Sequence, residues 1–366
     1  MDLYKIAASN LKGIGKQKLK QLCLRTNGIN ALFEEKLCSL EKKFNLKKEL
    51  LINMNISQAL TKARKQLDFN EKYGVQTLFM EDDHYPDLLK ECPDAPITLF
   101  YKGSVALNKK IISIVGTRRA TNYGKENVEK LIASLQGQDI IVISGLASGV
   151  DTFVHDCCVK HQIPTVGVLG HGLDTIYPRS NRNLAKKMLN NGGLLTEYGI
   201  GHKISKYCFP QRNRIIAGMS EVTIVIESPL KGGAIITAEI ANGYNREVMA
   251  IPGSIFSDSS KGCNALIKTQ KANLLENTDD LYRLMGWNNN SSEVRANINL
   301  TKQESVIVQL LKEENEIHFD TLLSKSDFSV SSLHSIVLKL ELKEIVQALP
   351  GSLFKLNHQT FSLDMA

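Results

Sequence analysis

Short apolar runs recur through the middle of the chain and are separated by polar stretches. Within each run Ile, Val and Leu follow one another without the alternation of a half-exposed strand, which is typical of strands buried on both faces of a parallel sheet. Most of the polar stretches between them have helical spacing, so the repeated units predict a doubly wound α/β domain. The runs cover residues 111–115, 140–143, 164–169, 193–197, 222–227 and 247–253.

The segments on either side follow other patterns. Residues 1–80 have leucines at helical spacings and no proline, so they are predicted to be helical, whereas the prolines in 85–103 predict an extended or turning segment. A polar Asn/Ser stretch predicts a linker, and three helical stretches and a hairpin after it predict a winged helix. We therefore expect a helical domain at 1–80, the α/β domain at 81–290, a linker at 291–300 and a winged helix at 301–366.

Charge is unevenly distributed between these regions. Residues 1–80 contain 15 Lys and Arg against 7 Asp and Glu, and residues 110–290 contain 20 against 15. Residues 300–366 contain 6 against 9, within a total net charge of +7. This distribution favours a polyanionic partner for the head and the middle but not for the tail, although lysines kept for solubility would give the same totals.

The composition and sequence motifs bear on the cellular location of the protein and on whether it binds a metal. No apolar run approaches the roughly 18 residues of a membrane span, and the first residues lack a signal-peptide core. The seven cysteines form no CxxC pair and the eight histidines no HExxH motif. We expect a cytoplasmic protein with no membrane segment, no metal and no cofactor.

The residues that follow the predicted strands are rich in glycine and cations. Ligands of an open parallel sheet bind beyond the carboxyl ends of its strands. Glycines and helix N-termini there let backbone N–H groups approach an anion, so four such loops predict a phosphate-bearing ligand, although any one of them could be a plain tight turn. The loops are Gly116-Thr117-Arg118-Arg119, the segment from Ser144-Gly145 through Gly149 to Asp151, Gly170-His171-Gly172, and Lys231-Gly232-Gly233 leading into a helix through Thr237.

The ligand can be narrowed further. The first strand is not followed by GxGxxG, and the chain has no Walker A motif, which disfavours a dinucleotide enzyme and ATP hydrolysis. Phe209 stands beside Arg212, Asn213 and Arg214, and an aromatic ring with forked cations suits single-stranded nucleic acid, stacking a base while holding phosphates. The alternative is that the two arginines pair with Glu197 and Glu221 for structure.

Two further patterns each allow a functional and a structural interpretation. Asp151 and His155 lie at i, i+4 of a predicted helix and could act as an orienting group and a base. Because no nucleophile accompanies them, we expect a buried His155 hydrogen-bonded to Asp151. The glycines and lysines of 11–19 have the form of a helix-hairpin-helix turn that would bring amides to a DNA phosphate, or of a simple turn between helices.

Seven strings together carry a family resemblance, and they occur in the family's order over about residues 85–275. The chain resembles the DNA-processing protein A (DprA/Smf) family, bacterial recombination mediators of natural transformation. The strings are YPDLL (85–89), IVGTRRATNYG (114–124), SGLASGVDTFVH (144–155), VLGHGLDTIYPRSNRNLA (168–185), FPQRNRIIAG (209–218), GGAIITAEIA (232–241) and REVMAIPG (246–253).

The resemblance implies an extended Rossmann-like domain between a helical, helix-hairpin-helix or SAM-like head and a winged helix. It also implies a homodimer that binds single-stranded DNA without catalysis and loads the RecA recombinase onto it. In this chain Gly232-Gly233-Ala234 replaces the family's Ser-Gly-Ser, which removes two hydroxyl donors. The DNA-binding residues that the resemblance implies are Gly116, Thr117, Arg118, Ser144, Gly145, Gly149, Phe209, Arg212, Asn213, Arg214, Lys231, Gly233 and Thr237.

Two other functions remain as alternatives. A nucleotide phosphoribohydrolase could use the same scaffold, with Glu239 as its nearby carboxylate and Asp151 and His155 assisting, and an interaction scaffold would bind no DNA. The third helix of the winged helix carries Lys339 and Lys343 against Glu341, which is too few cations for a duplex-reading helix. We expect this domain to have an accessory or protein-binding role.

Overall fold

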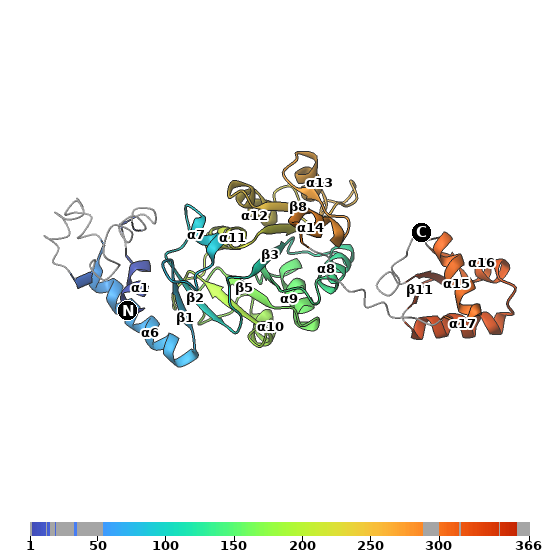
Figure 1. The fold of residues 1–366 in the computed structure, drawn as a ribbon, viewed down its shortest axis with the longest axis horizontal. Helices are drawn as coiled ribbons and strands as arrows, with labels where there is room; N and C mark the ends of the chain where they lie inside the picture. The colour runs from blue at the N-terminus through green and yellow to red at the C-terminus, as the bar shows by residue number, and fades with distance from the viewer. Residues whose placement is uncertain are drawn as a thin grey trace. The chain divides into compact units, whose positions relative to one another are not determined.

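The computed structural model describes residues 2–11, 13–14, 19, 33–34, 54–287, 300–314, 316–343 and 345–356. The chain divides into two compact units, 1–290 and 291–366 (Figure 1). Residues 12 and 15–18 of the possible helix-hairpin-helix turn, and residues 20–32 and 35–53 of the expected helical head, lie outside the described residues.

A mostly parallel sheet forms the centre of the first unit. In its described part the strands follow the order β1-β2-β6-β5-β4-β3-β7-β8-β9. The pairs from β6 to β9 are parallel, whereas β1 and β2 are antiparallel additions at one edge. The strands are β1 Gln76–Phe79, β2 Thr98–Gly103, β3 Lys110–Val115, β4 Ile140–Ser144, β5 Thr165–Leu169, β6 Gly192–Thr196, β7 Val222–Val225, β8 Glu247–Ala250 and β9 Asn273–Leu274.

The chain builds this sheet outward from β3 in both directions. Strands β4, β5 and β6 follow one another on one side of β3, and the chain then returns to place β7 on the other side. The strand order therefore reverses at β3, and the carboxyl ends of β3 and β7 mark the switch point at which such sheets bind ligands. The predicted doubly wound α/β fold and its six apolar strands are confirmed.

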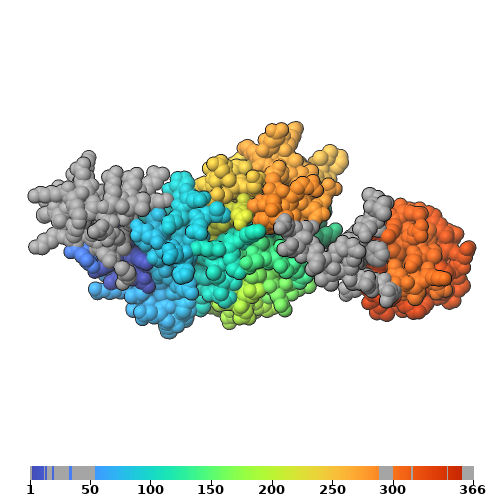
Figure 2. Space-filling view, in the orientation of Figure 1, coloured from blue at the N-terminus to red at the C-terminus, as the bar shows by residue number. Residues whose placement is uncertain are grey.

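Helices cover both faces of the sheet (Figure 1), and buried apolar side chains fill the space between them. Figure 2 shows the outer surface in the same orientation. Ile112 and Ile114 of β3 belong to the core under α8 and α9, whereas Ile111 and Val115 belong to the core under α11 and α12. Unbroken apolar runs are thus explained by burial on both faces. The helices of this unit are α1 Asp2–Ser9, α6 Ile56–Tyr73, α7 Asp87–Glu91, α8 Asn122–Ser134, α9 Val150–Lys160, η1 Arg179–Asn181, α10 Arg182–Met188, α11 Cys208–Met219, α12 Gly233–Gly243, α13 Lys261–Lys268 and α14 Thr278–Met285.

The prediction of helix up to residue 80 is wrong at its end, because residues 76–79 form strand β1. Helix α6 ends at Gly74, whose φ of 64° is left-handed and suits glycine. The chain then turns into a strand, and Leu78 and Phe79 are buried in the core.

The second unit has the predicted winged-helix elements and its own core. Ile307, Leu322, Leu333, Ile336 and Leu340 are buried together. A short first strand, which the sequence did not indicate, completes a sheet in the order β10-β12-β11. The elements are α15 Lys302–Glu313, β10 Ile317–His318, α16 Phe319–Lys325, α17 Val330–Leu342, β11 Val346–Leu349 and β12 Leu353–Leu356.

Of the helices that the structure describes, none has the length and apolar character to cross a membrane.

Candidate nucleic-acid interface

A cavity of about 530 Å³ opens at the switch point of the sheet. Its walls come from the loop after β3, the start of α9, the first turns of α11, and the loop that leads from β7 into α12. Eight of the predicted binding residues line it: Gly116, Thr117, Arg118, Phe209, Arg212, Asn213, Gly233 and Thr237. The structure thus brings together residues that are up to about 120 positions apart in the sequence.

The loop after β3, residues 116–121, is called the arginine loop. It presents two exposed guanidinium groups to the cavity, those of Arg118 and Arg119. Its backbone is held by neighbouring elements, because Val150 N donates to Thr117 O at 3.1 Å. Gly149 packs under it with a φ of 89°, and a Cβ there would lie 2.4 Å from Thr117 O. Gly149 therefore supports the arginine loop through close backbone packing and does not line the cavity.

Ser144 and Gly145 lie beneath the cavity instead of lining it. Ser144 Oγ donates to Ile114 O at 2.7 Å, and Gly145 N donates to Asp151 Oδ2 at 3.2 Å. A Cβ on Gly145 would lie 2.4 Å from the Arg212 guanidinium. These two residues hold the floor of the cavity in place.

Arg212 forms part of that floor and is 4% exposed. Its Nη1 donates to Gly145 O at 2.6 Å and also to Val168 O. Burial lowers its pKa to about 10, opposed by the nearby Asp151. Burial likewise raises the pKa of Asp151, opposed by Arg212. The guanidinium therefore contributes positive charge below the cavity while its hydrogen bonds go to protein carbonyls.

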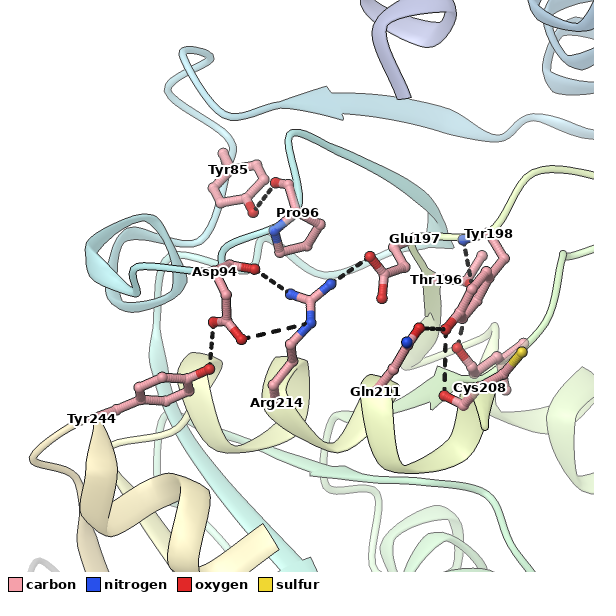
Figure 3. A network of polar contacts seen from close by, with 11 residues as sticks. Tyr85, Asp94, Pro96, Thr196, Glu197, Tyr198, Cys208, Gln211, Arg214 and Tyr244 are labelled. Carbon is pink, nitrogen blue, oxygen red and sulfur yellow. Dashed lines mark hydrogen bonds and ion pairs between the residues drawn. The ribbon is translucent and has the colours of Figure 1, made fainter. Parts of the chain in front are cut away.

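Arg214 lies on the same helix but does not line the cavity, which corrects the grouping expected from the sequence. Its guanidinium lies between Asp94 and Glu197 instead (Figure 3). Its Nη2 binds Glu197 Oε2 at 2.5 Å, and its Nη1 donates to Asp94 O at 2.6 Å. Tyr244 Oη donates to Asp94 Oδ1 on the far side of the network. The structural alternative is thus correct for Arg214 and Glu197, and this arginine fastens α11 to the proline-rich segment.

The prediction of a hydrogen bond between Asp151 and His155 is wrong. Asp151 sits in the first turn of α9 and accepts from Gly145 N and Ala147 N, because the amides of the preceding loop are nearer to it. His155 is fully buried and its Nδ1 bonds Thr165 Oγ1 at 2.7 Å. Burial, with Arg212 adding, lowers the pKa of His155 to about 3, so this imidazole is neutral at physiological pH.

An aromatic ring and a cation meet at the mouth of the cavity. The Arg118 guanidinium lies 5.9 Å from the centroid of the Phe209 ring. The exposed ring of Tyr177 is tilted relative to the Phe209 ring, and the two ring centroids are 5.8 Å apart. Lys206 also lines the cavity and was missed by the sequence analysis. Its spacing of three residues before Phe209 was the available signal. Lys231 is exposed beside the α12 loop but does not line the cavity.

The loop before α12 is open to a ligand at Gly233, where a Cβ would meet nothing within 4 Å. At Gly232 the situation is the reverse, because a Cβ would lie 2.1 Å from Ser228 Oγ. A side chain at residue 232 would therefore require the Ser228 hydroxyl to move.

The cavity combines cations with an apolar wall and has little acid. Asp151 is the single carboxylate among the described residues that line it, and its oxygens accept backbone amides. Glu239 lies outside the cavity, is exposed, and binds Lys271 Nζ at 3.0 Å. Within the described part of the chain, His, Cys, Asp and Glu form no group that could hold a metal ion. The geometry suits a phosphate-bearing ligand with a planar ring.

The fold and this site define a class: Rossmann-like α/β proteins with a cationic crevice at the switch point and an appended winged helix. Comparison with protein families makes the assignment specific. The family model for DNA recombination-mediator protein A matches residues 76–286, and the model for the DprA winged helix domain matches residues 291–352. The chain belongs to the DprA/Smf family of DNA-processing proteins.

Individual relatives agree with this assignment. The chain is 43% identical over 188 residues to DNA processing protein DprA of Streptococcus pneumoniae, covering 51% of this chain and 66% of that protein. It is 38% identical to that of Bacillus subtilis over 64% of this chain and 80% of the relative. The crystal structure of the S. pneumoniae protein superposes with a TM-score of 0.64 at 34% identity, covering 76% of this chain and 95% of that one.

A second solved structure comes from a relative described for its binding of single-stranded DNA. It describes the single-stranded DNA binding mode of DNA processing protein A from Helicobacter pylori. It superposes with a TM-score of 0.53 at 26% identity and covers 58% of this chain and 96% of that one.

Proposed function

We propose that this protein binds single-stranded DNA in the cavity at the switch point and loads the RecA recombinase onto the strand. The observation that carries the DNA-binding part is the placement of the Arg118 guanidinium against the Phe209 ring, opposite the glycine-rich start of α12. The single-stranded DNA named for the H. pylori relative supports it.

The geometry suggests how a strand is held. Arg118, Arg119 and Lys206 would neutralise phosphates, and the amides around Gly233 would add hydrogen bonds at the α12 N-terminus. Phe209 would stack a base, which favours single strands because their bases are free to unstack. Binding of this kind depends on salt and tolerates any sequence.

Several predicted residues support this site indirectly. Ser144, Gly145 and Gly149 shape the floor and the arginine loop, and Arg214 fixes the helix that carries Phe209. Lys231 lies outside the cavity and would contact the strand only beyond it.

The hydrolase alternative has less support. A phosphoribohydrolase needs a carboxylate that faces the sugar of the bound nucleotide, and Glu239 is instead paired with Lys271 outside the cavity. Asp151 is buried and accepts amides, so it is poorly placed to act as a base. We therefore propose a binding protein and not an enzyme.

Membership of the DprA/Smf family supports a proposal for the cellular role. We propose a cytoplasmic homodimer that receives single strands during natural transformation and passes them to RecA. No membrane contact and no cofactor are part of this proposal.

One experiment tests the central claim. Binding to fluorescent single-stranded and duplex oligonucleotides is titrated with salt, with and without RecA. We expect tight single-strand binding that weakens linearly on a log–log plot against salt, and faster RecA filament formation in its presence. Equal affinity for duplexes, or binding that ignores salt, would contradict the proposal, and release of bases from nucleoside monophosphates would favour the hydrolase.

A further inference from the structure

One buried carboxylate lies next to the arginine loop and has no part in the proposed contacts to DNA. Glu227 follows β7 and is 1% exposed. In the described part of the chain it forms no ion pair, although Arg118 and Arg119 belong to the loop beside it. Burying a carboxylate without a cation is costly unless hydrogen bonds satisfy it. Its hydrogen bonds therefore indicate what it does.

Those bonds hold both ends of the arginine loop. At the start of the loop, Thr117 N donates to the backbone oxygen of Glu227 at 2.7 Å. At its end, Thr121 N donates to Oε2 at 2.9 Å and Thr121 Oγ1 donates to Oε1 at 2.7 Å. Arg118 and Arg119 lie between these two anchors, so a single residue sets the position from which both side chains enter the cavity.

Two further elements contact the Glu227 carboxylate, the start of α8 and the loop after β8. Thr121 also caps helix α8 by accepting from Gly124 N at 3.2 Å. A Cβ on Gly124 would lie 2.3 Å from Glu227 Oε2, so the helix can approach the carboxylate only because glycine stands there. Ser259 Oγ donates to Oε1 at 3.0 Å and joins the loop after β8 to the same group.

We propose that Glu227 is a positioning residue for DNA binding, which acts through Arg118 and Arg119 by clamping the loop that carries them. This inference rests on the proposed binding of single-stranded DNA in the cavity. Glu227 touches no ligand itself. Its negative charge is not what binding needs; its hydrogen bonds to the amide and the hydroxyl of Thr121 are.

The substitutions Glu227→Ala and Glu227→Gln separate these roles. Alanine removes all three side-chain hydrogen bonds, whereas glutamine can accept the Thr121 amide with its oxygen and donate to the hydroxyls of Thr121 and Ser259. We expect Glu227→Ala to weaken single-strand affinity about tenfold and to lower the salt slope by about 0.7, the loss of one phosphate contact. Glu227→Gln should stay within twofold of wild type.

The decisive readout is the combination with an Arg118→Ala/Arg119→Ala variant. If Glu227 acts through these two arginines, adding Glu227→Ala to that variant weakens binding no further, whereas a general structural role makes the losses multiply. Multiplying losses, or wild-type affinity and salt slope in folded Glu227→Ala, would overturn the inference. Salt-insensitive binding by wild type would instead count against the proposed function.

A matched control comes from the other unit. Glu304 is also buried at a helix N-terminus and accepts from Thr301 N at 2.8 Å. Because it lies in the unit that does not contain the cavity, Glu304→Ala should leave DNA affinity unchanged. Should Glu227→Ala not fold, Thr121→Ala removes one anchor of the same loop and should weaken binding about threefold, with Thr121→Ser restoring it. Wild-type affinity in Thr121→Ala would then overturn the inference.

Discussion

Arg212 and Arg214, two positions apart on one helix, make different contacts. Residues two positions apart in an α-helix point about 200° apart around its axis. Arg212 therefore reaches the floor of the cavity while Arg214 faces Asp94 and Glu197. The sequence indicated both arginines because the motif contains both. Helical spacing alone could have shown that one of them must point away.

Arg214 is therefore expected to govern stability. Substituting alanine leaves Glu197 buried without its guanidinium, and breaking a buried pair costs about 3–5 kcal/mol. Calorimetry should show a markedly lower Tm for Arg214→Ala, and Lys125→Ala, an exposed residue of α8, should serve as a neutral control. A tenfold loss of DNA affinity with an unchanged Tm would contradict this assignment.

Arg118 is expected to govern binding. Its guanidinium is exposed at the cavity mouth, so alanine should leave the fold intact and weaken single-strand affinity more than tenfold, about 1.4 kcal/mol. Gel shifts and anisotropy titrations measure this directly. Lys125→Ala, an exposed cation on α8 outside the cavity, is the control. Equal binding by Arg118→Ala and wild type would refute the cavity as the DNA site.

His155 is expected to make the α/β unit sensitive to acid. Its pKa is lowered to about 3 in the folded chain by burial, against an ordinary value of 6.5, so the unfolded chain binds the proton first. Stability from the neutral imidazole is complete above pH 6.5 and is lost as the pH falls toward 3. Between pH 7.5 and 5 this amounts to about 2 kcal/mol. Denaturant unfolding of wild type and His155→Asn at both pH values should show a smaller pH effect in the variant.

At the scale of elements, burial explains what the sequence could predict. Strands β3 to β8 were readable because their residues are apolar on both faces, and the winged-helix helices because each has one apolar side. Strands β1 and β10 lie at sheet edges. The first residue of β1 is exposed and β10 has only two residues, so neither forms a run that is apolar on both faces. The loops that line the cavity could be predicted from the sequence. The positioning roles of Glu227 and Gly149 could not, because they depend on contacts with the backbone of Thr117 that a sequence motif does not show.

Gly149 gives a prediction at this scale. Alanine there would adopt a strained φ and also collide with Thr117 O, which displaces the arginine loop. Gly137→Ala is a matched control, because its φ is 78° but nothing lies within 4 Å of the added carbon. We expect Gly137→Ala to lose about 1 kcal/mol of stability from the strained φ. Gly149→Ala should lose more because of the collision, and it alone should lose DNA affinity. Equal affinity of the two would contradict the packing argument.

At the scale of the whole molecule, charge separates the two units. Residues 300–366 are net acidic, and the exposed apolar side chains of α17 include Leu338 and Leu342, which are 57% and 77% exposed. A helix of this kind is poorly suited to a DNA groove. A chain that ends after residue 287 should therefore keep single-strand affinity within twofold in the same titration. A loss greater than fivefold would show that the winged helix contributes to binding.

The separate cores of the two units have a consequence for measuring this protein. Cooperative unfolding requires that one set of packed side chains fails together, and here residues 1–290 and 291–366 each enclose their own. We expect two calorimetric transitions, of which substitutions near the cavity move one and Glu304→Ala moves the other. A single melting temperature for the whole chain would average two independent equilibria, so each variant has to be compared with the transition to which it belongs.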